Sequence, residues 1–265
     1  MRLPLHQIDA FASRLFEGNP AAVVPLEAWI PDTLMQDIAR ENNLSETVFA
    51  VPVGEGRHAL RWFSPLREIP FCGHATLACA HHFFEKDTSL QEVVFEAPAV
   101  GAMPVQKLSD GRIEMSFPRR EAVVVPVPEG LIAALGLAPL EVLANDQAYL
   151  AVLETEEQVR ALRPDMALLA SLGPRDVVVT APGTSHDFVS RYFWPANGGD
   201  EDPVTGSIHT ALAPYWADRL GKSELLAFQA SARTGVLHCR LHDNRVFLSG
   251  HARTYLHGTI ELEST

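Results

Sequence analysis

The sequence contains few cysteines and no long apolar run, and each absence excludes a class of protein. Three cysteines among 265 residues do not provide a disulfide framework, which indicates a reducing compartment. No apolar run reaches the roughly 18 residues that a membrane span requires, and the N-terminus lacks the apolar core of a signal peptide. We therefore expect a cytoplasmic protein with no membrane partner.

Basic residues are also scarce. The chain has 21 Lys and Arg against 33 Asp and Glu, a net charge of -12, and its basic residues form no run. This balance predicts no nucleic-acid partner. Neither a G-x-G-x-x-G motif nor a Walker-type loop occurs, so nothing indicates a nucleotide site. A small anion would have to be held by local groups such as backbone amides.

A weak internal repeat organises the chain. The segment "RWFSP" (Arg61–Pro65) recurs 130 positions later as "RYFWP" (Arg191–Pro195). Each copy is typical of a short aromatic strand that ends at proline. A polar loop follows each copy, and then a helix that begins with small residues, predicted at 72–85 and 205–220. Both helices are apolar on nearly all sides, which is typical of buried helices.

Short strands account for most of the remaining sequence, with exposed helices predicted at 32–42 and 131–135. Many strands around a buried helix, twice over, predict an α+β fold. We expect two pseudo-symmetric domains, each a β-barrel-like sheet wrapped around a central helix. The N-terminal domain would cover 1–120 and be completed by the C-terminal strand at 254–265. The second domain would cover 121–253.

The two helix starts are candidate anion sites. A helix N-terminus presents unpaired N–H groups and about half a positive charge. If Gly73 and the Thr205-Gly206-Ser207 segment face each other across a cleft between the domains, they would form a cage for a small carboxylate. The alternative for each start is plain helix capping.

Three residues could transfer protons. Glu46 lies in "NNLSETVFA", where an apolar strand begins, and partial burial would favour a role as a base; a solvated turn residue is the alternative. Asp202 precedes the second helix, where a carboxylate could also serve as a cap. His74 lies in the first turn of its helix, whose positive end favours a neutral imidazole.

Metal and nucleophilic-cysteine chemistry have little support in the sequence. His74 and His81 are roughly 10 Å apart along a helix axis, too far to share one zinc ion. No H-E-x-x-H motif is present. We therefore predict no metal site. A cysteine hydrolase would need a triad partner that the sequence does not identify.

Four motifs occur in order between Ile8 and His209: "IDAFASRLFEGNPAAVV", "LSETVF", "RWFSPLREIPFCGHATLA" and "EDPVTGSIH". Together with the final strand "GTIEL", they resemble the PhzF-like phenazine-biosynthesis family, part of the diaminopimelate epimerase-like superfamily. The resemblance implies two similar domains with the active site between them. It also implies an isomerase that uses no cofactor, acts on a small carboxylic acid and forms a homodimer.

The resemblance also assigns site residues. In phenazine biosynthesis the reaction moves a proton along trans-2,3-dihydro-3-hydroxyanthranilate, and the motif glutamate, here Glu46, is the principal acid–base group. His74 and Asp202 would assist it. The residues implied in substrate binding are Asn19, Ser45, Gly73, Thr205, Gly206 and Ser207.

Cys72 departs from this pattern. Epimerases of the superfamily use one cysteine per half, but the second half here reads "EDPVTGS", and Cys239 lies in a later strand. We therefore interpret Cys72 as a small buried wall residue. Glu46 would then remove a proton and return it elsewhere on the same face of the substrate. The alternatives are a two-base racemase that uses Cys72, and a non-catalytic carboxylate-binding protein. The physiological substrate stays open.

Overall fold

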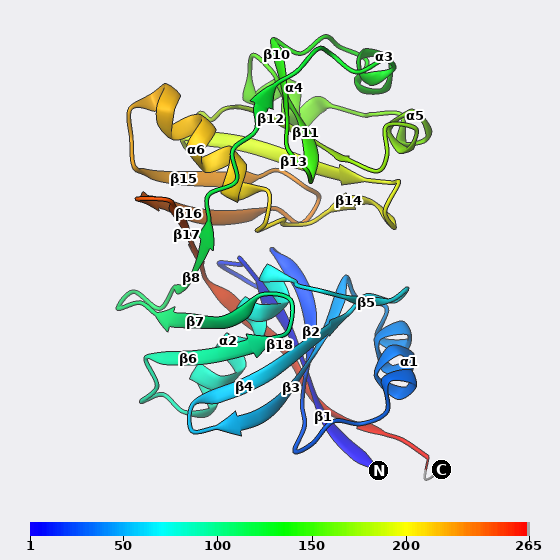
Figure 1. Ribbon diagram of the computed structural model, residues 1–265, viewed down its shortest axis with the longest axis vertical. Coiled ribbons are helices and arrows are strands. Elements are labelled where there is room, and N and C mark those ends of the chain that lie inside the picture. The colour runs from blue at the N-terminus through cyan, green and yellow to red at the C-terminus, as the bar shows by residue number, and fades with distance from the viewer. Residues whose placement is uncertain (264–265) are drawn as a thin grey trace. The chain divides into compact units, whose positions relative to one another are not determined.

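The computed structural model describes residues 1–263 as two compact units (Figure 1). Unit 1 comprises residues 1–116 and 249–263, and unit 2 comprises residues 117–248. The predicted domain boundaries, at residues 120 and 253, lie a few residues after the observed ones, at residues 116 and 248. Residues 264 and 265, the end of the predicted C-terminal segment, lie outside the described residues.

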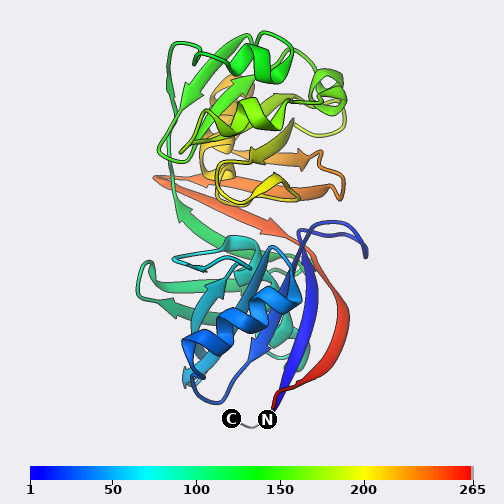
Figure 2. The ribbon, with the colours of Figure 1, turned by 90° about the vertical axis from the view of Figure 1, so that its right-hand side faces the viewer.

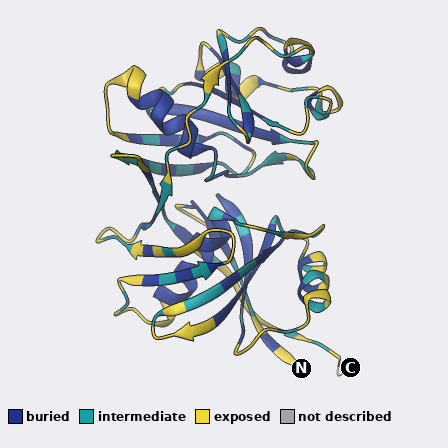
Figure 3. Cartoon of the chain, in the orientation of Figure 1, coloured by how far each residue is buried: buried dark blue, intermediate teal, exposed yellow. Residues whose placement is uncertain are grey.

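Unit 1 is a sheet that surrounds one helix. Helix α2 (Gly73–Lys86) packs against the strands at 2–10, 19–25, 46–54 and 252–261 and is buried over most of its length (Figure 3). Helix α1 (Asp32–Asn42) packs on the outer side of the sheet (Figure 2), where Met35, Ile38 and Ala39 join an apolar cluster. In pairing order the strands are β18 (Ala252–Glu261), β1 (Arg2–Ala10), β2 (Asn19–Pro25), β3 (Glu46–Gly54), β4 (Arg57–Phe63), β6 (Glu92–Ala97), β7 (Gly101–Lys107) and β8 (Ile113–Pro118), with β5 (Glu68–Ile69) also paired to β4.

Unit 2 repeats this architecture around α6 (His209–Leu220), which packs against β15 and β16. In pairing order its strands are β9 (Val123–Val124), β10 (Glu141–Ala144), β11 (Ala148–Val152), β12 (Asp176–Pro182), β13 (Phe188–Trp194), β15 (Glu224–Gln229) and β16 (Gly235–His242). Strand β14 (Gly199–Asp202) pairs with β13, and β17 (Arg245–Gly250) follows β16. The short helices α3 (Leu131–Leu135), α4 (Glu156–Ala161) and α5 (Met166–Ala170) contribute to a separate apolar cluster.

The sequence repeat has a structural meaning. Arg61 ends up beside β5, where its guanidinium donates to both oxygens of Glu68 at 2.7 and 2.6 Å. Arg191 likewise donates to both carboxylate oxygens of Glu201 on β14, at 2.8 and 2.9 Å. Such bidentate pairs are strong and directional. In each unit the repeated arginine therefore fixes a short return strand that leads toward the central helix.

The predicted elements agree with the structure except at one helix start. The helices predicted at 32–42, 72–85 and 131–135 are confirmed as α1, α2 and α3. The helix predicted from 205 is wrong at its beginning, because α6 starts at His209. A turn precedes α6, in which the His209 N–H donates to the Gly206 carbonyl at 3.1 Å. Within residues 1–263, no helix is long and apolar enough to cross a membrane.

Candidate active site

The predicted site residues of unit 1 meet where three elements begin. Strands β2 and β3 are parallel, with Ala21 opposite Glu46, so their first residues lie at the same edge of the sheet. Asn19 begins β2, Glu46 begins β3, and the first turn of α2 carries His74 to the same edge. All three side chains are buried although they are polar. Buried polar groups require partners, and the Asn19 amide and the His74 ring are partners of each other.

The conformation of the chain before β2 depends on a glycine. Gly18 has a φ of +71°, and a Cβ at this position would lie 2.2 Å from the carbonyl oxygen of Ala10. Only glycine combines this backbone conformation with so close an approach. The "GNP" segment therefore uses Gly18 to bring Asn19 into the buried start of β2.

A chain of hydrogen bonds orients the His74 ring. The Ser45 hydroxyl donates to Oδ1 of Asn19 at 3.1 Å, so the Asn19 amide nitrogen faces Nδ1 of His74 at 3.2 Å. The other ring nitrogen, Nε2, then lies 3.0 Å from Oε2 of Glu46. These two atoms are at ion-pair distance, although the N–H direction is not aligned for a regular hydrogen bond.

Charge and burial set the protonation of this cluster. Burial lowers the pKa of His74, whereas the Glu46 carboxylate and a thiolate at Cys72, whose sulfur lies 3.4 Å from Nδ1, would raise it above its usual value. Burial and the nearby Glu46 carboxylate raise the pKa of Cys72, so its thiol keeps its proton at neutral pH. With Cys72 protonated, the Glu46 carboxylate is the remaining charge that raises the pKa of His74. The raised pKa runs against the expected neutral imidazole, whereas the Asn19 amide, which can only donate, faces Nδ1 and suits a ring without a proton there. The neutral form of His74 stays a prediction.

Removal of the Glu46 charge should reverse the His74 shift. In Glu46→Gln we expect the pKa of His74 to fall below its wild-type value, because burial then acts without a compensating carboxylate. An NMR titration of the imidazole resonances in both proteins measures the change. The same pKa in both proteins would show that Glu46 is not the group that stabilises the imidazolium.

The same three side chains could also hold a metal ion. One donor atom each from Glu46, Cys72 and His74 lies within 4.8 Å of the others, and zinc accepts all three types of ligand. Binding would require Cys72 and His74 to give up protons that their raised pKa values favour. His81, the other histidine considered for a metal, lies farther along α2, and its Nε2 is 3.3 Å from Oε1 of Glu85. The absence of a metal stays a prediction.

In unit 2, the predicted residues form a second cluster between β14 and α6. Asp202 ends β14 and accepts a hydrogen bond from the Thr205 hydroxyl. Gln229, fully buried on β15, accepts from the Thr205 N–H and donates to the Asp202 carbonyl, each at 2.9 Å. The Thr205 N–H is therefore already bound to Gln229. The backbone N–H groups of Gly206 and Ser207 have no acceptor among the described residues.

The sequence alone did not identify Gln229, and its removal should loosen this turn. Gln229→Leu leaves the buried Thr205 N–H without an acceptor, and we expect a loss of about 1–3 kcal/mol in the free energy of unfolding. Urea denaturation measures the change. Gln106→Leu, at an exposed position, is the matched control and should change stability by less than about 0.5 kcal/mol. Equal effects of the two substitutions would contradict a bracing role.

A second missed residue is the counterpart of Glu46. Asp176 lies 130 positions after Glu46, the same spacing as the repeat, and it begins β12 as Glu46 begins β3. The Tyr192 hydroxyl donates to Asp176, and burial raises the pKa of this carboxyl group. Gln147 donates to Tyr192 at 3.0 Å and to the Ser207 hydroxyl at 2.8 Å. Extension of the repeat beyond its aromatic core would have found Asp176.

The two clusters belong to different units. The structure brings Asn19, Ser45, Glu46, Cys72, Gly73 and His74 together in unit 1, and Asp202, Thr205, Gly206 and Ser207 together in unit 2. That the two groups face one another across a cleft stays a prediction.

Comparisons with known proteins agree with the fold and extend over nearly the whole chain. Residues 8–258 match a protein family described as "Phenazine biosynthesis-like protein". An uncharacterized isomerase of Pseudomonas aeruginosa is 51% identical, with 99% of this chain and 100% of that protein covered. A crystal structure of a PhzF family protein from Enterococcus faecalis has a TM-score of 0.93 at 42% identity, covering 99% of this chain and 100% of that one.

A more distant structure shares the fold alone. A hydroxyproline epimerase from Agrobacterium vitis has a TM-score of 0.64 at 11% identity, covering 99% of this chain and 93% of that one. The predicted fold class, two pseudo-symmetric sheets each wrapped around a helix, is thereby confirmed.

Proposed function

Because the chain belongs to the phenazine biosynthesis-like protein family, we propose that it catalyses cofactor-independent acid–base proton transfer on a small carboxylic acid. The chain is an isomerase of this family, as its relatives are. The proposal concerns the chemistry by which it isomerises and the class of its substrate.

The buried pair of Glu46 and His74 carries the proposal. A carboxylate can accept a proton from carbon, and an imidazole with a raised pKa only 3.0 Å away can relay that proton. Asn19 and Ser45 fix the ring, so the pair is preorganised for the transfer. Such paired groups with perturbed pKa values are typical of catalytic sites.

Backbone amides would hold the carboxylate of the substrate. Gly73 is the first residue of α2, so its N–H and that of His74 lack acceptors within the helix, whereas the Thr76 N–H already donates to the Cys72 carbonyl. Gly206 and Ser207 would supply the corresponding donors in unit 2, and Asp202 would assist the proton transfer there. Donors of this kind stabilise the negative charge that develops when carbon loses a proton beside a carboxylate.

A single base favours a proton shift over inversion of a stereocentre. Inversion needs acidic and basic groups on opposite faces of the substrate, and the alternative racemase would use Cys72 as one of them. The three cysteines, Cys72, Cys79 and Cys239, are all buried, and burial raises the pKa of each thiol. The non-catalytic alternative is set aside, because the chain is an isomerase.

Deuterium incorporation from D2O tests the proposal. The purified enzyme is incubated with a panel of small unsaturated and hydroxy carboxylic acids, and NMR follows deuterium at carbon. We expect at least one acid to incorporate deuterium and to isomerise, with both rates retained in Cys72→Ala. Loss of both rates in a folded Cys72→Ala would support the racemase, and an isomerised acid without solvent deuterium would argue against exchangeable proton transfer.

A further inference from the structure

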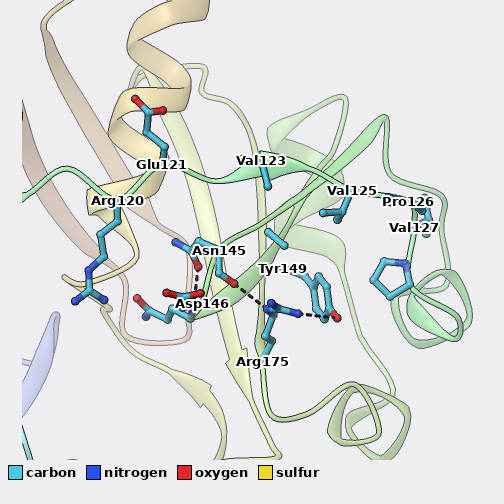
Figure 4. Close-up of a pocket in the computed structure, with 13 residues that line it drawn as sticks. Arg120, Glu121, Val123, Val125, Pro126, Val127, Asn145, Asp146, Tyr149 and Arg175 are labelled. Atoms are coloured by element: carbon cyan, nitrogen blue, oxygen red, sulfur yellow. Dashed lines mark hydrogen bonds between the residues drawn. The ribbon is translucent and has the colours of Figure 1, made fainter.

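Unit 2 contains a cavity of about 800 Å³ that is separate from the Glu46 and His74 pair (Figure 4). Its apolar wall is formed by residues 125–128, which are two valines and two prolines. Its polar wall comes from residues near the turn between β10 and β11, together with Arg175 and Arg120. A cavity of this size with an apolar wall and a few fixed polar groups is typical of a small-molecule site.

Two hydrogen bonds hold the Arg175 side chain at the wall of this cavity. Its Nε donates to the Asn145 carbonyl at 2.8 Å, one terminal nitrogen donates to the Tyr149 hydroxyl at 3.5 Å, and the guanidinium lies 5.4 Å from the centre of the Tyr149 ring. The side chain is only partly exposed, and no carboxylate among residues 1–263 lies within ion-pair distance of it. Arg175 is therefore an oriented cation whose remaining N–H groups are available.

The other charged residues that line the cavity form no ion pair with Arg175. Arg120 also lacks a carboxylate partner among the described residues, and Glu121 is paired with Arg119 at 2.9 Å. Asp146 is exposed. We propose that the cavity binds a small carboxylate with an apolar body, whose carboxylate pairs with Arg175 while its body contacts residues 125–128. Arginine suits this role because its planar guanidinium donates two parallel hydrogen bonds to a carboxylate.

The cavity also adjoins the predicted substrate-binding turn. Gln147 lines the cavity, and its side-chain amide donates to the Ser207 hydroxyl and to Tyr192. A bound carboxylate beside Arg175 would change the surroundings of this amide. Gln147 therefore reports occupancy of the cavity independently of activity.

Benzoate is a suitable probe, and benzamide is its uncharged counterpart. In ¹H–¹⁵N NMR spectra of the whole protein, we expect benzoate to shift the Arg175 Nε and Gln147 side-chain resonances in a saturable way. Benzamide should bind at least about tenfold more weakly, because it lacks the charge that strengthens the bond to arginine. Arg175→Gln should weaken benzoate binding by at least the same factor, and Arg175→Lys should weaken it less.

The control is Arg67→Gln, which removes an exposed arginine from unit 1 and should leave benzoate binding unchanged. The spectrum of each variant shows whether it is folded. Equal binding of benzoate and benzamide, undiminished binding in a folded Arg175→Gln, or no saturable shift at Arg175 would overturn the proposal. Shifts confined to the surroundings of His74 would place the ligand in the proposed active site and would also overturn it.

Discussion

Glu46→Gln is expected to slow deuterium exchange into the substrate by a factor on the order of 10²–10⁴, the usual contribution of a positioned general base. Glutamine keeps the shape of the side chain but cannot accept a proton from carbon at neutral pH. The loss should appear in the turnover rate more than in substrate binding, because the proposed carboxylate donors are backbone amides elsewhere. Exchange is measured on the acid for which the wild-type enzyme is most active.

Two variants sharpen this experiment. Glu55→Gln removes an exposed carboxylate between β3 and β4 and should leave the exchange rate unchanged. Glu46→Asp keeps a base but moves it by about one bond length, so an intermediate rate is expected. Wild-type exchange in Glu46→Gln would remove Glu46 as the essential base and would direct attention to His74 and Asp202.

Acidification should destabilise the protein between about pH 6.5 and pH 4, and His209 should account for a large share. This ring is fully buried at the start of α6, beside the Phe188 ring. Its Nδ1 is 2.8 Å from the Thr205 carbonyl, which fits a neutral ring that donates there. Burial lowers the pKa of His209 to about 4, and its other nitrogen has no hydrogen-bond partner among the described residues.

The sign of the effect follows from proton linkage. In the unfolded chain a histidine titrates near 6.5, so between pH 6.5 and 4 the unfolded state binds a proton that the folded state rejects. The stabilisation is present above pH 6.5, is lost progressively as the pH falls, and changes no further below about pH 4. From these two pKa values, His209 contributes about 2–3 kcal/mol to the stability difference between pH 7 and pH 4.5.

His209→Asn isolates this contribution. Urea denaturation at pH 7 and pH 4.5 gives the stability difference for each protein, and the difference should be smaller in the variant by about 2–3 kcal/mol. Any loss at neutral pH from repacking cancels in this comparison. His242→Asn, at an exposed position on β16, should retain the full wild-type difference. A variant whose acid sensitivity matches the wild type would rule out His209 as a major source.

Local patterns predicted much of the fold. The helices α2 and α6 are apolar on nearly all sides, which is typical of the buried centre of a unit. The proline-terminated aromatic repeat predicted the two-fold arrangement, and the structure adds the Arg–Glu pairs of Arg61 and Arg191 that the repeat encodes. The helices α4 and α5 were not predicted, because elements of one or two turns are too short to show a hydrophobic period.

Motifs in the sequence likewise indicated which residues carry the chemistry but not their electrostatic state. Glu46 and His74 are separated by a strand, a hairpin and a loop, and only the packing of α2 against β3 brings their atoms to 3.0 Å. That contact raises the pKa of His74. The position of His74 in the helix alone indicated the opposite.

The hydrogen-bond partners of three further residues, Gln229, Asn19 and Arg175, also depend on the tertiary structure. The sequence by itself determined the two-fold organisation, the buried central helices and the residue types at their starts, because these depend on patterns within a few turns of chain. The tertiary structure alone decided which distant side chains became partners. Hydrogen bonds and ion pairs act over about 3 Å, and no spacing along the chain specifies a contact of that range between separate elements.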